Sequence, residues 1–166
     1  MTSESATPPA GRKQAPPARA QAQPFQGLAN SIVRVLLRAP LIGPAVGGRL
    51  ITLYLVGRRS GKHYEIPVAY TRDGAVLLIG TPFGWGRNLR TGEPVDVLLK
   101  GKRRTADVQV ITDEAGVTAH YAVMARDNRQ FAKFNKIGID SDGNPDPADL
   151  RAAWAAGARG FRLTPR

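Results

Sequence analysis

The sequence contains no cysteine and only two histidines, His63 and His120, and this scarcity excludes several kinds of chemistry. Without a thiol there is no disulfide, no thiolate metal site and no cysteine nucleophile. Two histidines without an H-E-x-x-H motif predict that there is no metal centre. A serine triad would need one of these histidines, and no G-x-S-x-G motif accompanies them. We therefore expect His120, which lies in a predicted helix, to be a surface or hydrogen-bonded helix residue.

Long hydrophobic runs are also missing. No apolar stretch reaches the roughly 18 to 20 residues that a membrane span needs. The N-terminus lacks the basic region followed by an apolar stretch that marks a signal peptide. Together with the absence of cysteine, these features predict a cytoplasmic protein. The 166 residues, 42% of them hydrophobic, suffice for one domain with its own core.

Acidic residues are scarce as well, with 13 of them against 24 basic residues and a net charge of +11. Residues 1–24 carry +2 of this charge, so +9 belongs to the rest of the chain. Such a field favours nucleic acid, anionic lipid or an acidic small molecule as partner. The chain has no recognisable nucleic-acid motif, so nucleic acid is the unlikely partner among these. A non-enzymatic binder of nucleic acid or of a membrane surface, or a basic surface with no specific partner, remains the alternative to an enzyme.

The composition of the chain changes near residue 25. Residues 1–24 are rich in Pro, Ala, Gln and Ser and predict a disordered tail, because they have too little apolar surface to bury. Residues 25–166 predict a single domain. It opens with an amphipathic helix, since apolar residues recur at helical spacing from Phe25 to Leu36 before Pro40 ends the run. This helix, over residues 25–38, packs on the core or lies on a membrane surface.

Strand patterns dominate from Arg49 onward. Residues 49–56 are β-branched and apolar on both faces, which is typical of a fully buried strand. Asp73-Gly74 is a strong hairpin signal, and Gly101-Lys102 indicates a second hairpin. The last short strand would tie the end of the chain into the sheet. The predicted strands are 49–56, 64–70, 75–79, 95–100, 105–111 and 161–164.

Two helices are predicted late in the chain. The first runs without interruption over residues 114–136, with Asp113 as its N-cap. The second begins at Asp146-Pro147 and ends at Gly157. Five or six mostly antiparallel strands with peripheral helices predict an α+β fold, either a small barrel or a curled sheet with helices on its flank. A homodimer would cover the edge strands of such a sheet.

The turn after the first strand carries the most chemical information. It reads Gly57-Arg58-Arg59-Ser60-Gly61-Lys62, and its glycines are expected to let the backbone turn sharply and expose N–H groups while its cations converge on an anion. It is not a Walker A loop, because only three residues separate the two glycines and a strand follows. The alternative is a solvated hairpin turn.

A second segment of interest follows a glycine-rich loop over residues 80–86. Trp85 and Asn88 stand three residues apart at the start of a predicted short helical turn. They would offer a flat apolar wall and a polar handle, a combination that suits an aromatic cofactor ring. The alternative is that Trp85 simply fills the core.

In order and spacing, these motifs resemble the deazaflavin-dependent nitroreductase family over roughly residues 28–112. The matching residues are Leu53-x-x-x-Gly57-Arg58-Arg59-Ser60-Gly61-Lys62, Pro67-Val68, Asp73-Gly74, Trp85-x-x-Asn88-Leu89 and Pro94-Val95-x-Val97 before Gly101, and residues 160–165 look like the family's final strand. The resemblance implies a split β-barrel of the FMN-binding type that binds coenzyme F420. It also implies hydride transfer from the reduced deazaflavin to a quinone, a nitro compound or a similar electrophilic acceptor. Family members often carry a membrane-associated N-terminal helix, which implies a peripheral position on the inner face of the cell membrane.

The resemblance also implies roles for individual residues. The phosphate and glutamate tail of the coenzyme would be held by Arg58, Arg59, Ser60, Gly61 and Lys62. The deazaflavin would be lined by Pro67, Val68 and Ala69, and its far wall closed by Trp85, Asn88 and Leu89. Aromatic candidates for the substrate pocket are Tyr70, Tyr121, Phe131 and Phe134. Two departures from the family, Tyr64 in place of an arginine and a shortened loop before Trp85, leave FMN, haem or a lipid as alternative ligands of the same fold.

Overall fold

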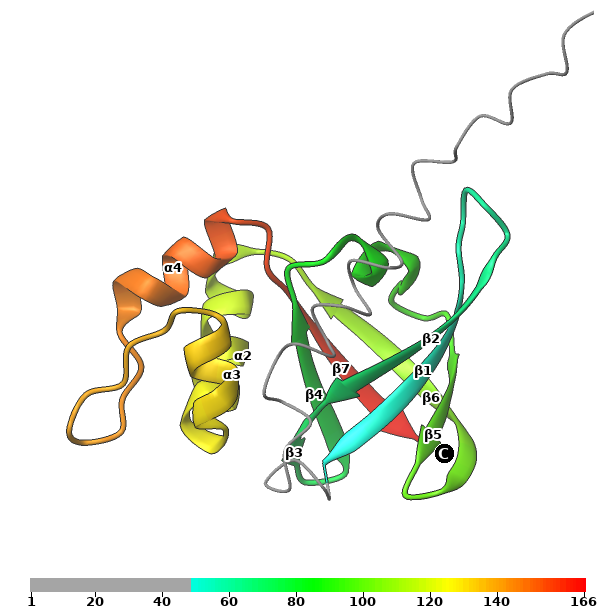
Figure 1. The fold of residues 1–166 in the computed structure, drawn as a ribbon, viewed down its shortest axis with the longest axis horizontal. Helices are drawn as coiled ribbons and strands as arrows, with labels where there is room; N and C mark the ends of the chain where they lie inside the picture. The colour runs from blue at the N-terminus through cyan, green and yellow to red at the C-terminus, as the bar shows by residue number, and fades with distance from the viewer. Residues whose placement is uncertain (1–48) are drawn as a thin grey trace, which may run out of the picture.

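The computed structural model describes residues 49–166 as a curled antiparallel sheet with three helices along one side (Figure 1). This confirms the predicted α+β class and is consistent with a split barrel. The expected tail over residues 1–24 and the expected amphipathic helix over residues 25–38 both lie outside the described residues. Within residues 49–166, no helix is long and apolar enough to cross a membrane.

The sheet has seven strands in the order β2-β1-β5-β6-β7-β4-β3, and all neighbours are antiparallel. Their bounds are β1 Leu50–Val56, β2 His63–Ala69, β3 Thr71–Asp73, β4 Val76–Thr81, β5 Val95–Leu99, β6 Lys102–Ile111 and β7 Arg159–Pro165. The two edge strands, β2 and β3, are separated along the chain by Tyr70 alone. Because consecutive Cα atoms are about 3.8 Å apart, the two edges must meet there, and the sheet closes into a half-barrel.

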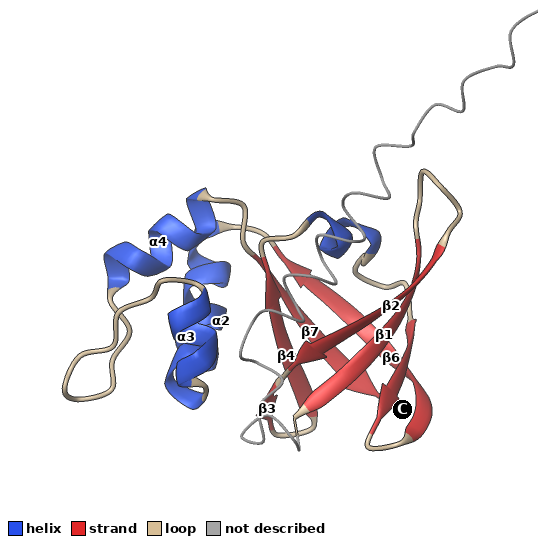
Figure 2. Cartoon of the chain, viewed as in Figure 1, coloured by secondary structure: helices blue, strands red, loops and turns tan. Residues whose placement is uncertain are grey.

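The inner face of the half-barrel holds the main core. On β1, Ile51, Leu53 and Leu55 are buried, whereas Leu50 and Val56 are exposed. The expectation that this strand is buried on both faces is therefore wrong. Helices α2, α3 and α4 cover the outer face around β4 and β7, so among residues 49–166 the apolar partner layer of β1 lies on its inner side. Figure 2 shows these three helices together on the left of the barrel, away from β1.

The helical layer is inserted between β6 and β7. Its members are α2 Glu114–Asp127, α3 Arg129–Phe134 and α4 Pro147–Ala155. Asp113 and Asp146 cap α2 and α4 as predicted, because their side chains accept backbone N–H groups of the first turns. Apolar side chains of these helices form a second core against the outer face of β4, with Leu78 pointing outward from that strand into it.

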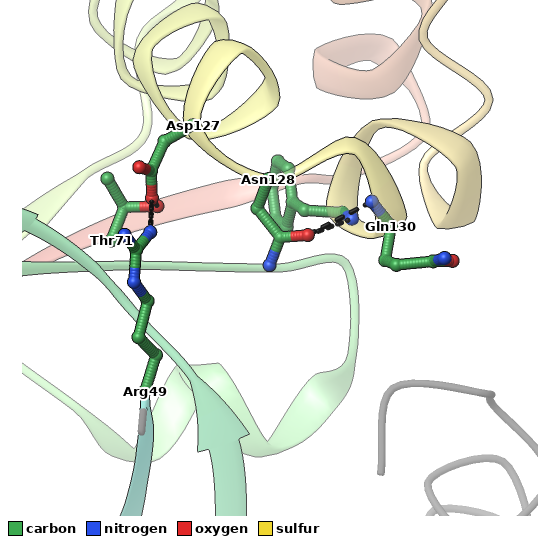
Figure 3. Close-up of polar contacts among 6 residues, drawn as sticks. Arg49, Thr71, Asp127, Asn128 and Gln130 are labelled. Atoms are coloured by element: carbon green, nitrogen blue, oxygen red, sulfur yellow. Dashed lines mark hydrogen bonds and ion pairs between the residues drawn. The ribbon is translucent and has the colours of Figure 1, made fainter. Parts of the chain in front are cut away.

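The predicted uninterrupted helix over residues 114–136 is wrong, because the chain breaks it at Asn128. This residue has extended backbone geometry, and its Oδ1 accepts the N–H groups of Gln130 at 3.0 Å and Phe131 at 3.1 Å (Figure 3). Asn128 thus ends α2 and caps α3. An asparagine side chain competes in this way with helix hydrogen bonding, so the helix restarts in a new direction.

The end of α2 is fastened to the barrel by Asp127. Its carboxylate accepts a hydrogen bond of 2.9 Å from the hydroxyl of buried Thr71 and forms an ion pair with Arg49 (Figure 3). Thr71 begins β3, and Arg49 directly precedes β1. One carboxylate therefore joins the helical layer to two segments near the meeting edges of the sheet.

His120 on α2 is buried rather than on the surface, with 5% of its surface exposed. Its Nε2 lies 2.9 Å from the carbonyl oxygen of Ile79, while Nδ1 has no hydrogen-bond partner among residues 49–166. Of the two expected alternatives, a surface position is therefore wrong, and a hydrogen-bonded helix residue holds for Nε2 but not for Nδ1. Burial lowers the pKa of the imidazole below its ordinary value, the Ile79 carbonyl opposes this shift, and the positive charge of Arg162 adds to it.

This lowered pKa of His120 predicts a loss of stability in mild acid. The unfolded chain takes up a proton near pH 6.5, whereas the folded protein holds a neutral ring until the pH falls further. The free energy of unfolding should therefore fall as the pH drops below about 6.5, by at most about 1.4 kcal/mol per unit for this one proton, and level off below the folded pKa. Urea unfolding of the wild type and of His120→Gln measures this. Equal pH dependence in the two proteins would contradict it.

Candidate functional site

The cationic turn predicted from the sequence is a tight, closed loop between β1 and β2. The N–H of Gly57 donates to the carbonyl of Lys62 at 2.8 Å, and the N–H of Gly61 donates to the carbonyl of Gly57 at 2.7 Å. Gly61 has a φ of +64°, which favours glycine. A Cβ on Gly57 would lie 2.6 Å from the Ser60 hydroxyl and 2.9 Å from the Tyr64 ring. The shape of the loop therefore favours glycine at both positions.

The backbone of this turn offers less to an anion than its sequence suggests. Four of its six N–H groups, those of Gly57, Arg58, Gly61 and Lys62, donate within the protein. The glycines make the turn possible by closing it on itself, so the expectation that they expose N–H groups is largely wrong. Recognition of an anion at this turn must come mainly from side chains.

The structure brings the two predicted segments together through Asn88. Its Oδ1 accepts the Arg58 N–H at 3.2 Å, and its Nδ2 donates to the Trp85 carbonyl at 3.1 Å. Asn88 ends the short 3-10 turn Gly84–Asn88, which lies at the same end of the barrel as the β1–β2 turn (Figure 1). The side chain predicted to contact a ligand thus spans two loops and holds them at a fixed distance.

The four basic side chains near this end differ in what they already bind. The guanidinium of Arg58 forms an ion pair with Glu93, so this side chain connects the β1–β2 turn to the segment that precedes β5. Arg59 is exposed and has no hydrogen-bond or ion-pair partner among the described residues. Lys62 is exposed as well, and so is Arg87 in the 3-10 turn. Arg87 was missed by the sequence reasoning, although its place next to Asn88 could have indicated it.

An exposed apolar strip lies on the outer face of β1 and β2. Leu50 is opposite Ala69 and Thr52 is opposite Pro67 in the antiparallel register, so these side chains share one face. Leu50 is 39% exposed, Pro67 is exposed and Ala69 is half-buried. Pro67 is tolerated because β2 is an edge strand. Of these residues, Leu50 had not been predicted to contribute to the site.

Other predicted cofactor residues lie inside the main core. Val68, Trp85 and Leu89 are at most 9% exposed, and the Trp85 ring stacks on Phe161 at 6.3 Å between centroids. The structure therefore does not bring these three side chains together with Pro67 and Ala69 on one exposed surface. The position of Trp85 agrees with the alternative in which it fills the core.

The aromatic residues predicted for a substrate pocket are dispersed. Tyr70 is buried in the main core, whereas Tyr121 and Phe131 pack on each other at 5.0 Å between centroids in the second core. Burial raises the pKa of the Tyr121 phenol well above its ordinary value, so this group stays protonated. Phe134 is 38% exposed, and its ring lies 6.1 Å from that of Phe83.

The arrangement can bind an anion but offers little chemistry of its own. Residues 49–166 contain no group of three or more histidines and carboxylates that could hold a metal ion. Arg59, Lys62 and Arg87 supply positive charge around the loop, and the apolar strip lies further along the outer face of β2, beyond the exposed Glu65. Such a surface can hold and orient a ligand that combines negative charges with an apolar body.

The chain was compared with protein families, curated proteins and solved structures, and only the solved structures gave a match. No family model and no curated protein matches the chain. Among solved structures, the conserved hypothetical protein Rv2991 from Mycobacterium tuberculosis is similar, with 12% sequence identity and a TM-score of 0.44. The match covers 78% of this chain and 80% of that protein.

Proposed function

We propose that this protein is a deazaflavin-dependent oxidoreductase that transfers a hydride from reduced coenzyme F420 to a quinone, a nitro compound or a similar electrophile. The observation that carries the proposal is the braced cationic turn, in which Arg59 is exposed and has no partner among residues 49–166. The resemblance of the turn and of the following strand to the family supplies the identity of the cofactor.

The geometry fits an elongated ligand with one anionic and one apolar end. Pro67 is five positions after Lys62 along an extended segment, which corresponds to about 17 Å. The negatively charged tail would lie at Arg59 and Lys62, and the flat ring would lie against Pro67, Ala69 and Leu50. The inward-facing Val68 and Trp85 would support this surface from within the core rather than touch the ring.

The protein's own part in the reaction is to bind and orient. The coenzyme supplies the hydride, so the chain needs neither a nucleophile nor a metal ion. Arg59 and Lys62 neutralise the tail, and the Asn88 contact with the turn keeps the cationic end at a fixed place relative to the barrel. Cytoplasmic location, attachment to a membrane surface through residues 25–38 and a homodimer are further predictions that accompany this proposal.

Titration with coenzyme F420, followed by tryptophan fluorescence, tests the proposal. The wild type should bind in the micromolar range, and Arg59→Ala should raise the dissociation constant at least about tenfold, which corresponds to about 1.4 kcal/mol. The matched control is Arg126→Ala, which removes the same charge from the exposed end of α2 and should change the dissociation constant less than about twofold.

Two outcomes would count against the proposal in different ways. Equal affinities of Arg59→Ala and Arg126→Ala would show that the turn does not hold the coenzyme. No binding up to about 100 µM would reject coenzyme F420 itself. Absorbance spectra with FMN and haem, and binding of a fatty acid, would then identify which of the alternative ligands this fold carries.

A further inference from the structure

A basic pocket lies at the end of the barrel opposite the cationic turn. It has a volume of about 420 Å³ and is formed where the β3–β4 and β5–β6 turns come together, at the lower end of the barrel in Figure 1. Leu77 and Leu99 line it from the core side, and Arg72, Lys100, Lys102 and Arg104 surround them. None of the residues predicted to bind the coenzyme contributes to this pocket.

The strand register places three of these cations on the core face of the sheet. Residues directly opposite each other in an antiparallel pair lie on the same face. Arg72 is opposite Leu77, Lys102 is opposite Leu99 and Arg104 is opposite Val97, and all three of these partners belong to the main core. On β6, for example, the inward-facing positions are basic at this end of the barrel, with Lys102 and Arg104, and apolar further along, with Ala106 and Val108.

The carboxylates of the strands all face the other way. Glu65, Asp73, Asp96 and Asp107 occupy the outer face, opposite Tyr54, Val76, Thr105 and Thr164. Asp73 pairs there with Arg162, and Asp107 pairs with Arg166, which lowers the pKa of Asp107. Arg162 and Arg166 are thus paired with carboxylates outside the pocket, whereas no acidic residue lines the basic pocket itself.

The basic side chains have few bonds within the described protein. The guanidinium of Arg72 donates to the Gly74 carbonyl at 3.4 Å, and that of Arg104 donates to the main-chain oxygen of Arg166 at 3.3 Å. The side chains of Lys100 and Lys102 have no hydrogen-bond or ion-pair partner among residues 49–166. Four like charges around one opening repel each other, and a multivalent anion between them would relieve this repulsion.

We propose that this basic pocket is a second binding site, for a multivalent organic anion such as a phosphate ester with an apolar body. The four cations would take the charged group, and the apolar part would lie on exposed Ala75 and half-buried Pro165, above a floor formed by the buried Leu77 and Leu99. The volume lies within the range of about 300 to 1,000 Å³ that is typical of small-molecule sites. The proposal does not rest on the function proposed for the cationic turn.

Naphthyl phosphate is a suitable probe, because it joins a dianion to an apolar ring. We expect calorimetry to show binding at least about tenfold tighter than that of inorganic phosphate, which lacks the apolar part. Lys102→Gln with Arg104→Gln should weaken the binding of naphthyl phosphate at least about tenfold. The matched control, Arg126→Gln with Arg129→Gln on the helices, removes the same charge and should leave the affinity within about twofold.

Methyl resonances locate the probe. Naphthyl phosphate should shift the methyl signals of Leu77 and Leu99 in the wild type and leave them unchanged in the Lys102/Arg104 variant. The proposal is overturned if the helix variant loses as much affinity as the pocket variant, if inorganic phosphate binds as tightly as the probe, or if the leucine methyls do not respond. Thermal unfolding of each variant verifies that these exposed substitutions leave the fold intact.

A phosphate ester can reach the pocket as a free metabolite or as a lipid headgroup, and vesicles distinguish these sources. Sedimentation with vesicles of phosphatidic acid and phosphatidylcholine, lost in the Lys102/Arg104 variant, would identify the lipid. Absence of sedimentation, with naphthyl phosphate bound in solution, would identify a free ligand. Sedimentation that persists in the pocket variant, without leucine methyl shifts, would reject the site.

Discussion

Replacing Phe161 by alanine should lower the free energy of unfolding by about 3 to 5 kcal/mol. Phe161 is fully buried on the inner face of β7, which lies between β6 and β4 in the sheet. Its ring stacks on Trp85 and lies so close to Gly86 that a Cβ there would be 2.9 Å from it. Alanine would remove an aromatic ring from the centre of the main core and leave a cavity, which urea unfolding measures as a lower midpoint.

Two variants show whether the loss comes from this particular packing. Phe161→Leu keeps most of the volume and should cost less than the alanine variant. Phe134→Ala makes the same chemical change at a site that is 38% exposed and should cost only about 1 kcal/mol. A similar loss at both phenylalanines would contradict the assignment of Phe161 to the centre of the core. Because the 3-10 turn rests on Phe161, its alanine variant should also shift tryptophan emission toward the red.

Gly160→Ala should destabilise the protein by about 1 to 3 kcal/mol, because α2 lies directly on the sheet at this point. An added Cβ would be 2.8 Å from Cδ2 and 2.9 Å from Cγ of the buried His120 ring. The ring cannot move aside freely, since its Nε2 is held 2.9 Å from the carbonyl oxygen of Ile79. Gly80, directly opposite Gly160 in the register, lies just as close to Tyr121.

The matched control is Gly84→Ala, because nothing lies within 4 Å of the added Cβ there. That variant should be neutral or more stable by up to about 1 kcal/mol, since alanine restricts the unfolded chain. A double variant separates steric overlap from strand propensity. In a His120→Ala background, Gly160→Ala should cost much less than in the wild type, and additive losses would show that the ring is not the obstacle.

Local features of the fold followed directly from the sequence. Asp73-Gly74 forms the expected hairpin, and Gly74 has a φ of +59°. Asp113 and Asp146 begin helices, and the last strand ties the end of the chain into the sheet. These features depend on backbone preferences and hydrogen bonds within a few residues, and such signals can be read without knowing the rest of the molecule.

The errors arose where two local preferences competed. Asn128 carries a helix-like pattern on both sides, yet its side chain caps a new helix instead of continuing the old one. The three residues of β3 are too few for a periodic pattern and were not predicted. The cationic turn has the composition of an anion-binding loop, but its N–H groups close the loop on itself. Composition does not determine which of several acceptors an N–H group takes.

The sequence by itself determined the fold class, most strands and helix starts, and the concentration of charge in the turn at residues 57–62. Only the tertiary structure decided which distant residues meet: Arg58 with Asn88, His120 with Ile79 and Gly160, and Arg72 with Lys102 and Arg104 around one basic pocket. The physical reason is that strand register and sheet curl are set by packing of the whole core. A shift of one residue in a strand would move Arg72, Lys102 or Arg104 to the opposite face of the sheet.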